Sequence, residues 1–351
     1  MRQPRHCPVF AALCLLVVVT AGNFGFAADL VRVGEAPVVS GGALSIARAR
    51  GYFQKLGLDL DEKRFEDGTS AVSAITAGEI DLALLPVEAS LFNGIGRGAP
   101  LLIVLDAGHN RRGFGATGIN VATALYDEGV NSVRDFTELK GRKFGVAALG
   151  GVYQYNAALS LVKARLDPAT DVEWVVKPQG ELVHMLERNE LEAADLDFRF
   201  GYVAQESKWG PIIISDDQIV PDGEIAVLAA RKEYLAKNRD PAVRFAMAYL
   251  RAAREFNAAA RDPGAHSDIV DILAQSTTAN DPELMRAIAP NWSYIADDGA
   301  PLVTPLMAMQ DFWSGRHFSF VEKKASRKEA FDLTVAKEAK TRLEKHKPFG
   351  N

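Results

Sequence analysis

The chain has 351 residues, of which 48% are hydrophobic and 24% are charged, and its formal net charge is −5. This composition is that of an ordinary globular protein, long enough for two domains with cores of their own. The negative charge argues against nucleic acid or an anionic membrane surface as the binding partner.

Residues 1–27 have the features of a cleaved secretory signal peptide. Arg2 and Arg5 precede a short apolar run, and Gly25 and Ala27 form the small-x-small pattern of a signal-peptidase site. The run is shorter than the about 20 apolar residues that span a bilayer, which disfavours the alternative of a retained signal anchor. We therefore expect a periplasmic protein, and the loss of both arginines changes its formal net charge from −5 to −7.

Both cysteines of the chain, Cys7 and Cys14, lie in this removed segment. Leu13 stands before Cys14, where a lipidated cysteine usually follows a small residue, so lipid attachment is not expected. The exported chain should have no disulfide, thiol nucleophile or thiolate metal site, and its core alone must hold the fold together.

Strand-like and helix-like segments alternate through the first hundred residues. The expected strands are 30–36, 58–65, 81–86 and 101–107, and the expected helices are 43–57, 70–77 and 89–98. This alternation is typical of a parallel sheet with helices on both faces. For the helix that follows Phe65, Thr69 or Ser70 is the expected N-cap and Gly78 the expected C-terminal stop.

The alternation restarts beyond a stretch rich in glycine and charge, residues 108–117. A strand near 224–231 resembles a return to the first unit, and nearly everything after Asp240 has helical periodicity. We predict an α/β fold of two lobes joined by two crossover strands, with a helical C-terminal tail and a hinged cleft between the lobes. The expected ranges are 28–107 and 225–351 for the first lobe, 118–216 for the second lobe, and 107–118 and 216–225 for the hinge crossovers.

Two glycine turns, one in each predicted lobe, lie between a strand and a helix. They are Ser40-Gly41-Gly42 and Gly150-Gly151. Backbone N–H groups at the start of a helix can hold an anionic group, and glycine lets a ligand approach closely. Either turn alone could equally be an ordinary strand-to-helix connection. Two such turns that face one cleft favour ligand binding.

Other motifs weigh against a cofactor, a metal or catalysis. Gly113, Gly115 and Gly118 match the dinucleotide-binding spacing, but the preceding strand ends near Leu105 and no amphipathic helix follows, so we predict no cofactor there. The six histidines show no metal-binding spacing, so no metal site is predicted.

Acidic and basic side chains near the predicted cleft allow more than one functional interpretation. Glu88, Asp195 and Asp197 follow or end strands, but no nucleophile or metal-ligand cluster accompanies them, which disfavours acid–base catalysis. Arg112, beside Arg111, either clamps a carboxylate or sulfonate in the cleft or belongs to a solvated hinge.

Three segments resemble the periplasmic solute-binding proteins of ABC importers, in the branch that includes sulfonate, taurine, nitrate and thiamine-precursor binders. They are Ala49–Leu58, Ala77–Ala83 and Asp135–Val146. The resemblance covers nearly the whole mature chain. It implies the type II periplasmic-binding-protein fold, a monomer with no enzymatic activity and no cofactor, and a permease and its ATPase in the inner membrane as partners.

The resemblance also implies which loops touch the ligand. Carried over by position, the contacts are Ser40, Gly41, Gly42, Thr69, Ser70, Val87, Glu88, Ala89, Gly150, Gly151 and Tyr153, with Asp197 and Phe198 in a later loop. The expected ligand is a small organic acid, such as a sulfonate or an aromatic or aliphatic carboxylate. A neutral heterocycle related to a thiamine-precursor pyrimidine is the second choice. An enzyme of pyrimidine synthesis on the same fold, using Asp195, Asp197 or His109, and a sensor subunit are the rival functions.

Overall fold

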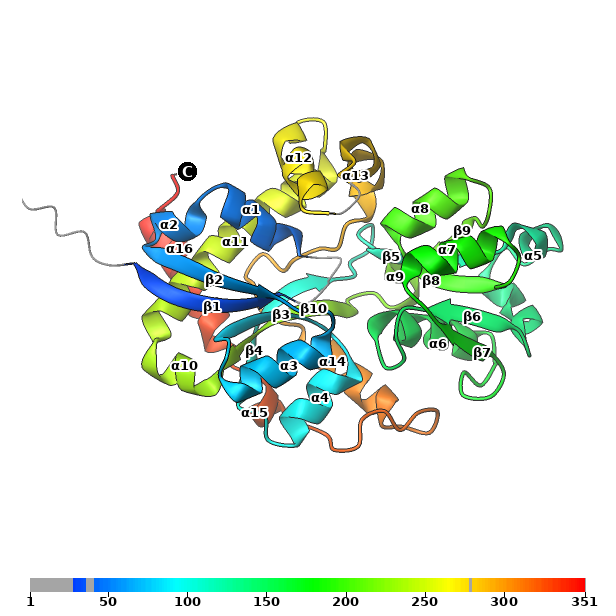
Figure 1. The fold of residues 1–351 in the computed structure, drawn as a ribbon, viewed down its shortest axis with the longest axis horizontal. Coiled ribbons are helices and arrows are strands. Elements are labelled where there is room, and N and C mark those ends of the chain that lie inside the picture. Colours follow the sequence, from blue (N-terminus) through cyan, green and yellow to red (C-terminus); the bar gives the residue numbers. More distant parts are fainter. Residues whose placement is uncertain (1–27, 36–40, 278–279, 351) are drawn as a thin grey trace, which may run out of the picture.

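A computed structural model describes residues 28–35, 41–277 and 280–350. The predicted signal peptide and the site residue Ser40 lie outside the described residues. The described chain forms two five-stranded sheets, each covered by helices on both faces (Figure 1). Each sheet with its covering helices is called a lobe below, the first lobe being the one that contains the N-terminal strand.

The first sheet has the strand order β2-β1-β3-β10-β4. Its strands are β1 (Asp29–Glu35), β2 (Leu58–Arg64), β3 (Leu82–Pro86), β4 (Leu101–His109) and β10 (Glu224–Arg231). β1 runs parallel to β2 and β3, whereas β10 is antiparallel to both of its neighbours, β3 and β4. The segment that follows the second lobe therefore returns into the middle of the first sheet.

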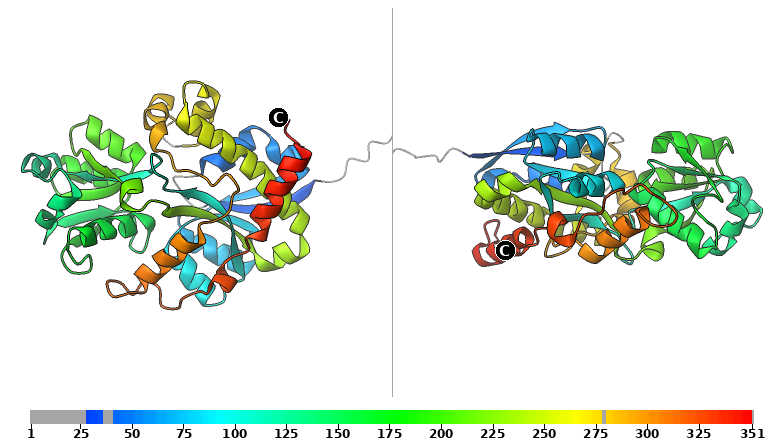
Figure 2. Two further views of the ribbon diagram at one scale, coloured as in Figure 1. Left: turned by 180° about the vertical axis from the view of Figure 1, so that it is seen from behind. Right: turned by 90° about the horizontal axis from the view of Figure 1, so that it is seen from below.

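β10 is almost entirely apolar because both of its faces are buried. Ala226, Leu228 and Ala230 face a core that includes α1 (Gly42–Ala49), α11 (Arg239–Arg261) and α16 (Thr334–His346). The alternate residues Ile225, Val227 and Ala229 face a second core with α3 (Gly68–Ala77), α4 (Ala89–Gly96) and α14 (Val303–Trp313). The helical C-terminal tail thus covers both faces of this sheet, and α16, red in Figure 2, lies against α11.

The first lobe and its tail contain further helices. They are α2 (Tyr52–Lys55), α10 (Lys232–Lys237), α12 (Ser267–Gln275), α13 (Pro282–Ile288), the 3₁₀ turn η2 (Ala289–Asn291) and α15 (Arg327–Ala330). α13 contacts α8 (Phe198–Glu206) of the second lobe, so the tail reaches across the space between the lobes.

The start of α3 differs from the prediction. The N-cap is Asp67, whose carboxylate accepts hydrogen bonds from the Ser70 backbone N–H and hydroxyl, both at 2.7 Å. Thr69 and Ser70 therefore lie inside the first turn, and the expectation that one of them caps the helix is wrong. An aspartate in extended backbone ahead of Gly68 offers a charged acceptor, which competes well with a hydroxyl. The predicted stop is confirmed, because α3 ends at Ala77 and Gly78 has φ 78°.

The second sheet has the order β7-β6-β8-β5-β9. Its strands are β5 (Thr117–Val121), β6 (Lys143–Val146), β7 (Glu173–Val176), β8 (Ala193–Asp197) and β9 (Ile212–Ser215). The helices of this lobe are α5 (Thr123–Asp127), η1 (Val133–Leu139), α6 (Val152–Lys163), α7 (Gln179–Glu187), α8 (Phe198–Glu206) and α9 (Asp216–Ile219). β5 is antiparallel to β8 and β9, as β10 is to its neighbours in the first sheet. Its presence was not predicted, and Gly118 lies on it rather than on a phosphate-binding turn.

The chain passes between the two sheets twice, and the two connections are bonded to each other. Asn110 N donates to Gly223 O at 2.8 Å, and Asp222 N donates to Asn110 O at 2.9 Å. Gly113 N also donates to the Asp217 carboxylate at 2.8 Å. The connections therefore form one paired bridge between the lobes.

Candidate functional site

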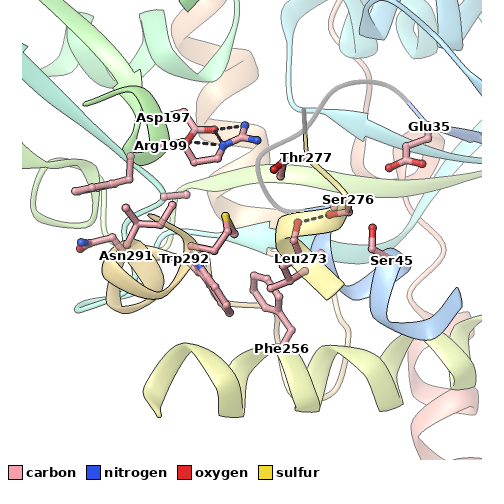
Figure 3. A pocket seen from close by; sticks show the side chains of 16 residues that line it. Glu35, Ser45, Asp197, Arg199, Phe256, Leu273, Ser276, Thr277, Asn291 and Trp292 are labelled. Carbon is pink, nitrogen blue, oxygen red and sulfur yellow. Dashed lines mark hydrogen bonds and ion pairs between the residues drawn. The ribbon is translucent and has the colours of Figure 1, made fainter. Parts of the chain in front are cut away.

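A cavity of about 100 Å³ lies between the two lobes and beneath the helical tail (Figure 3). The residues that line it come from the end of β1, from α1, from the connection before β5, from the start of α8 and from the tail between α11 and Trp292. They are Glu35, Gly41, Gly42, Ser45, Ala116, Asp197, Phe198, Arg199, Phe256, Leu273, Ser276, Thr277, Met285, Ile288, Asn291 and Trp292.

The α1 side of the cavity depends on close backbone packing. Gly41 is the N-cap of α1, and no described side chain caps that end of the helix. A Cβ on Gly42 would lie 2.6 Å from the Phe256 ring and 2.7 Å from Leu273. Glycine at this position therefore lets the N-terminal end of α1 approach α11 and α12, with the helix start at the cavity wall.

The α8 side presents a buried ion pair. Asp197 is 1% exposed and is the N-cap of α8, where its carboxylate accepts a hydrogen bond from Arg199 N at 2.8 Å. The Arg199 guanidinium donates to the same carboxylate through Nε at 3.0 Å and through Nη2 at 2.6 Å. Gln179 Oε1 accepts from Asp197 N at 2.8 Å, which fixes the start of the helix.

One edge of that guanidinium remains free for a ligand. No described residue accepts a hydrogen bond from Arg199 Nη1, and Figure 3 shows the guanidinium pointing toward Thr277 across the cavity. The charge of Asp197 raises the pKa of Arg199 and outweighs desolvation, which lowers it. The site thus holds an oriented guanidinium cation, and its Nη1 edge faces the cavity.

An aromatic wall faces this cation. Phe256 and Trp292 are stacked with their ring centroids 5.3 Å apart and their planes at 23°. Phe198 joins them at the α8 end, and all three side chains are less than 10% exposed. Flat apolar surfaces of this kind suit the body of a ring-containing or otherwise apolar solute.

The opposite end of the cavity carries a carboxylate. Glu35, at the end of β1, lies near Ser45 and far from Arg199 in Figure 3. Its only described ion pair is a long one of 3.4 Å to Arg48. The cavity is therefore polar at both ends, with a hydrogen-bond donor edge at Arg199 and an acceptor at Glu35.

Of the residues expected at the ligand, Gly41, Gly42, Asp197 and Phe198 line this cavity. Thr69 and Ser70 are exposed at the start of α3 and do not line it. Arg112 is exposed on the connection after β4 and does not line it either. Its neighbour Arg111 stacks on the Tyr294 ring, with the guanidinium carbon 4.2 Å from the centroid.

Two other predicted contact loops touch each other instead of the cavity. Glu88 and Gly151 form an antiparallel bridge, and Ala89 N donates to Gly150 O at 2.8 Å. Gly150 has φ 70°, and a Cβ there would lie 3.1 Å from the Ala89 Cβ, so glycine permits the approach. Burial raises the pKa of Glu88.

The two remaining predicted residues lie behind these loops. Val87 is fully buried in the core of the first lobe. Tyr153 lies on α6, and burial, followed by the charge of Asp197, raises the pKa of its hydroxyl. Its hydroxyl therefore stays neutral beside the Asp197–Arg199 pair.

Sequence reasoning missed most of the cavity wall. Arg199, Phe256, Thr277 and Trp292 line the cavity and are not among the contacts expected from the sequence. The Asp197-x-Arg199 spacing at the end of a strand was the available signal, because it places a carboxylate and a guanidinium at one helix start. Nothing comparable marks Phe256 or Thr277, whose place at the cavity depends on how the tail folds back.

Two groups of buried acidic side chains lie outside the cavity. Asp106, His109 and Glu224 bring potential metal-ligand atoms within 4.8 Å of one another in the first lobe. Asp195 and Asp216 lie together in the second lobe, where burial raises the pKa of Asp216 to about 6 and raises that of Asp195 well above its usual value. Asp195 and His109, named for the rival enzyme function, do not line the cavity.

Comparison with known proteins assigns the chain to a family. The sequence profile of the NMT1-like family matches residues 28–274, and the chain therefore belongs to that family. This confirms the resemblance that the three sequence segments indicate. None of the helices in the described residues is both long and apolar enough to cross a bilayer.

Individual proteins are similar to the chain at low identity. The bicarbonate transport ATP-binding protein CmpC of Synechococcus elongatus is 24% identical over 266 residues, which are 73% of this chain but only 39% of that relative. Among solved structures, the periplasmic nitrate-binding protein NrtA from Synechocystis PCC 6803 matches with a TM-score of 0.71 and 15% identity, over 90% of this chain and 89% of that one. The periplasmic aliphatic sulphonate binding protein SsuA from Escherichia coli gives 0.63 and 16%, over 85% and 92%. The chain thus has the generic periplasmic-binding-protein fold, which confirms the predicted fold class.

Proposed function

We propose that the chain is the extracytoplasmic solute-binding component of an ABC import system, which closes around a small organic acid and delivers it to a membrane permease and its ATPase. In this proposal residues 1–27 are a cleaved signal peptide and the mature protein is a periplasmic monomer. Residues 28–107 with 225–351 form one lobe, 118–216 form the other, and 107–118 with 216–225 form the hinge. Membership of the NMT1-like family and the likeness to the nitrate- and sulphonate-binding folds support it.

The observation that carries the ligand class is the free edge of Arg199. Asp197 orients the guanidinium and keeps it charged, so Nη1 and the outer side of Nη2 can donate to one carboxylate or sulfonate group. The start of α1, which no described side chain caps, adds backbone N–H groups from the other lobe. Phe256 and Trp292 then cover the body of the solute, and the cavity of about 100 Å³ limits that body to a small one.

Closure follows from the fact that both lobes contribute to the cavity. A solute held by Arg199 on α8 and by Gly42 on α1 touches both lobes only when they are together. Such a ligand binds the closed arrangement better than the open one and shifts the population toward it. No bond is made or broken, so we propose that the chain is not an enzyme.

A neutral heterocycle is the second candidate, and Glu35 favours it. A carboxylate at the cavity wall accepts hydrogen bonds from ring N–H or amino groups and repels a second negative charge. The Asp197 carboxylate also balances the charge of Arg199. A thiamine-precursor pyrimidine would satisfy both the acceptor and the aromatic wall.

A thermal-shift screen of the purified mature chain distinguishes the two candidates. Its compounds are small aromatic carboxylates, aliphatic and aryl sulfonates, nitrate and aminopyrimidines, because a ligand that binds the folded state raises the melting temperature. The matched variants are Arg199→Lys, which keeps the charge but loses the planar fork, and Arg112→Lys on the exposed connection.

We expect an acid to raise the melting temperature of the wild type and Arg112→Lys, and to raise that of Arg199→Lys much less. The organic-acid assignment is overturned if only an aminopyrimidine stabilises the chain, or if Arg199→Lys responds like the wild type. The binding function itself fails if no compound shifts the melting temperature while one of them is turned over.

A further inference from the structure

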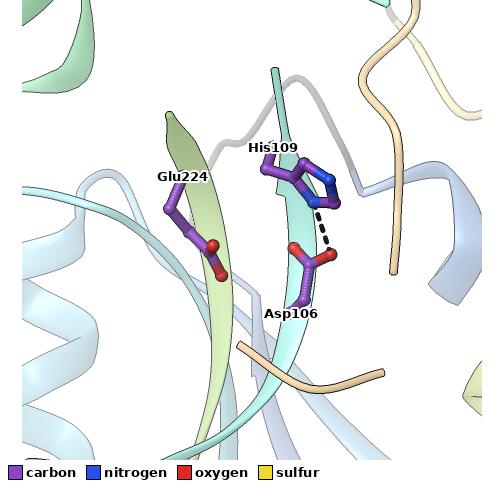
Figure 4. A group of neighbouring side chains, drawn as sticks. All are labelled: Asp106, His109 and Glu224. Atoms are coloured by element: carbon purple, nitrogen blue, oxygen red, sulfur yellow. Dashed lines mark hydrogen bonds and ion pairs between the residues drawn. The ribbon is translucent and has the colours of Figure 1, made fainter. Parts of the chain in front are cut away.

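Three buried titratable side chains meet at the base of the paired connections, away from the solute cavity. Asp106 and His109 lie on β4, and Glu224 is the first residue of β10 (Figure 4). Glu224 is the register partner of His109 across the two strands. Asp106 and Glu224 are fully buried and His109 is 6% exposed, and one ligand atom from each lies within 4.8 Å of the other two.

A local irregularity of the sheet brings these groups to one side. Residues three apart on a regular strand point to opposite faces, so Asp106 and His109 would normally diverge. The pairing of β10 with β4 shifts register on both sides of Ala226, and Gly108 has φ 145°, which favours glycine. Gly108 N then donates to Asp106 Oδ1 at 2.7 Å, which fixes the kinked strand.

The hydrogen bonds around the cluster leave one buried acceptor without a donor. Asp106 Oδ2 is bonded to His109 Nδ1 at 2.7 Å and to Ala296 N at 2.6 Å. Glu224 Oε2 accepts from Leu302 N at 3.1 Å. Glu224 Oε1 has no hydrogen-bond partner in the part of the chain that the structure describes, and Figure 4 shows the Glu224 carboxylate turned toward Asp106 and His109.

It is unfavourable to bury a carboxylate oxygen without a hydrogen-bond donor next to another buried carboxylate, unless a positive charge lies between the two groups. We infer that Asp106, His109 and Glu224 bind one divalent transition-metal cation, with zinc as the best match. One imidazole nitrogen and two carboxylate oxygens are zinc ligands, and a fourth position is commonly filled by water. Tetrahedral zinc holds neighbouring ligand atoms roughly 3.3 Å apart, and the three candidate ligand atoms lie within 4.8 Å of one another, so rotation of the side chains would bring them to the zinc spacing.

The surroundings fit a structural role for this cation. Ala296 and Leu302 donate their backbone N–H groups to the two carboxylates, and the Tyr294 ring lies edge-on to His109 at 5.6 Å. Tyr294 and His109 also exchange both backbone hydrogen bonds, at 2.8 and 3.0 Å. The cation would join β4, β10 and the tail segment 294–302 where the two connections leave the first lobe.

The acidic pair of the second lobe illustrates the alternative to a metal ion, which is a protonated carboxyl group. There Asp216 Oδ2 accepts hydrogen bonds from the Thr117 hydroxyl and the Asn156 amide. Burial raises the pKa of Asp195, and a proton on Asp195 removes the repulsion between the two carboxyl groups. No imidazole accompanies it in the described structure. A proton shared by Asp106 and Glu224 is the corresponding alternative for the first lobe, and metal analysis separates the two.

The test uses zinc itself with the full mature chain. The protein is stripped with a chelator, desalted, equilibrated with Zn²⁺ and desalted again, and its zinc is counted by inductively coupled plasma mass spectrometry. Co²⁺ absorption and the melting temperature with and without Zn²⁺ give independent readouts. The variants are Glu224→Gln and His109→Gln, and the control is His184→Gln, which removes an exposed histidine beside Glu187.

We expect the wild type and His184→Gln to retain one zinc per chain and to melt several degrees higher with Zn²⁺ than without it. Glu224→Gln, which keeps the shape of the side chain, should lose both effects even if His109→Gln fails to fold. The inference is overturned if the wild type retains no zinc, or if zinc retention and stabilisation persist in Glu224→Gln. Solute binding is measured separately and does not depend on either outcome.

Discussion

The two lobes meet on two sides, and the two sides differ in what fills the space between them. On the side of α4 and α14, protein atoms meet directly through the Glu88–Gly151 bridge and the packing of Tyr155. On the side of α1, α12 and α13, the lobes enclose a cavity with a free guanidinium edge and an aromatic wall. Equivalent strand-to-helix loops thus serve as a lobe contact on one side and as a binding surface on the other.

The contact side is largely apolar. Tyr155 of the second lobe lies 5.2 Å from Phe312 and 5.8 Å from Trp313, ring centroid to centroid, in edge-on arrangements. His317 of the tail pairs with Asp167 of the second lobe at 2.9 Å at the rim. These contacts contribute to the closed arrangement from one side, and in the proposed mechanism the solute adds its contacts on the other side.

The largest expected effect comes from emptying the contact side. Tyr155→Ala removes a buried ring from between Phe312 and Trp313 and should lower the free energy of unfolding by about 3 kcal/mol. Chemical denaturation measures it, and Tyr155→Phe serves as the control that keeps the ring. A loss of less than about 1 kcal/mol would mean that the lobes do not rely on this contact.

The next effect falls on the cavity side. Arg199→Lys keeps a positive charge beside Asp197 but cannot donate from a planar fork to both Asp197 and a ligand. The dissociation constant for an acidic solute should rise about tenfold, which is about 1.4 kcal/mol, by isothermal titration calorimetry. If Arg112→Lys weakens binding as much, the acid is held on the exposed connection after β4 rather than in the cavity.

A smaller effect links the contact side to pH. Burial raises the pKa of Glu88, so the folded chain keeps a proton there that the unfolded chain has already lost. Stability should therefore fall as pH rises above the ordinary glutamate pKa of about 4.3, until the raised pKa is passed, and then stay level. Glu88→Gln should remove this fall, so its melting temperature should exceed that of the wild type at pH 7.5 and match it at pH 4. Equal melting temperatures at both pH values would contradict the shift.

The smallest effect is expected at the start of α3. Thr69→Ala and Ser70→Ala change exposed side chains outside the cavity and should alter solute affinity by less than about twofold, or about 0.4 kcal/mol. Asp67→Ala removes the N-cap and should cost about 1 kcal/mol of stability without changing affinity. A clear loss of affinity in Ser70→Ala would move the solute toward α3 and away from Arg199.

Much of the fold could be predicted because the relevant signals are local. Apolar segments separated by glycine and capping residues mark β1 to β4 and the end of α3 at Gly78, and the apolar run at 225–230 marks a buried strand. β5 was missed because its short sequence, TGINV, follows a glycine-rich stretch and has no strong alternation. The Asp67 cap was missed because two hydroxyl residues next to it are equally good local candidates.

The cavity could be predicted only in part, because it depends on which loops meet. Gly42 and Asp197 belong to strand-to-helix loops, which sequence patterns reveal. Phe256 and Trp292 belong to the tail, whose path over α1 is set by packing between residues more than 200 positions apart. Sequence also cannot show that Ala89 and Gly150 touch each other and so leave no room for a solute there.

The most direct test of the proposed ligand class is native mass spectrometry of the chain isolated from cells without added ligand. The free edge of Arg199 predicts one noncovalent solute per chain, which on release is detected as a small carboxylate or sulfonate anion and is reduced or absent in Arg199→Lys. A neutral or basic heterocycle released equally by both proteins would contradict it.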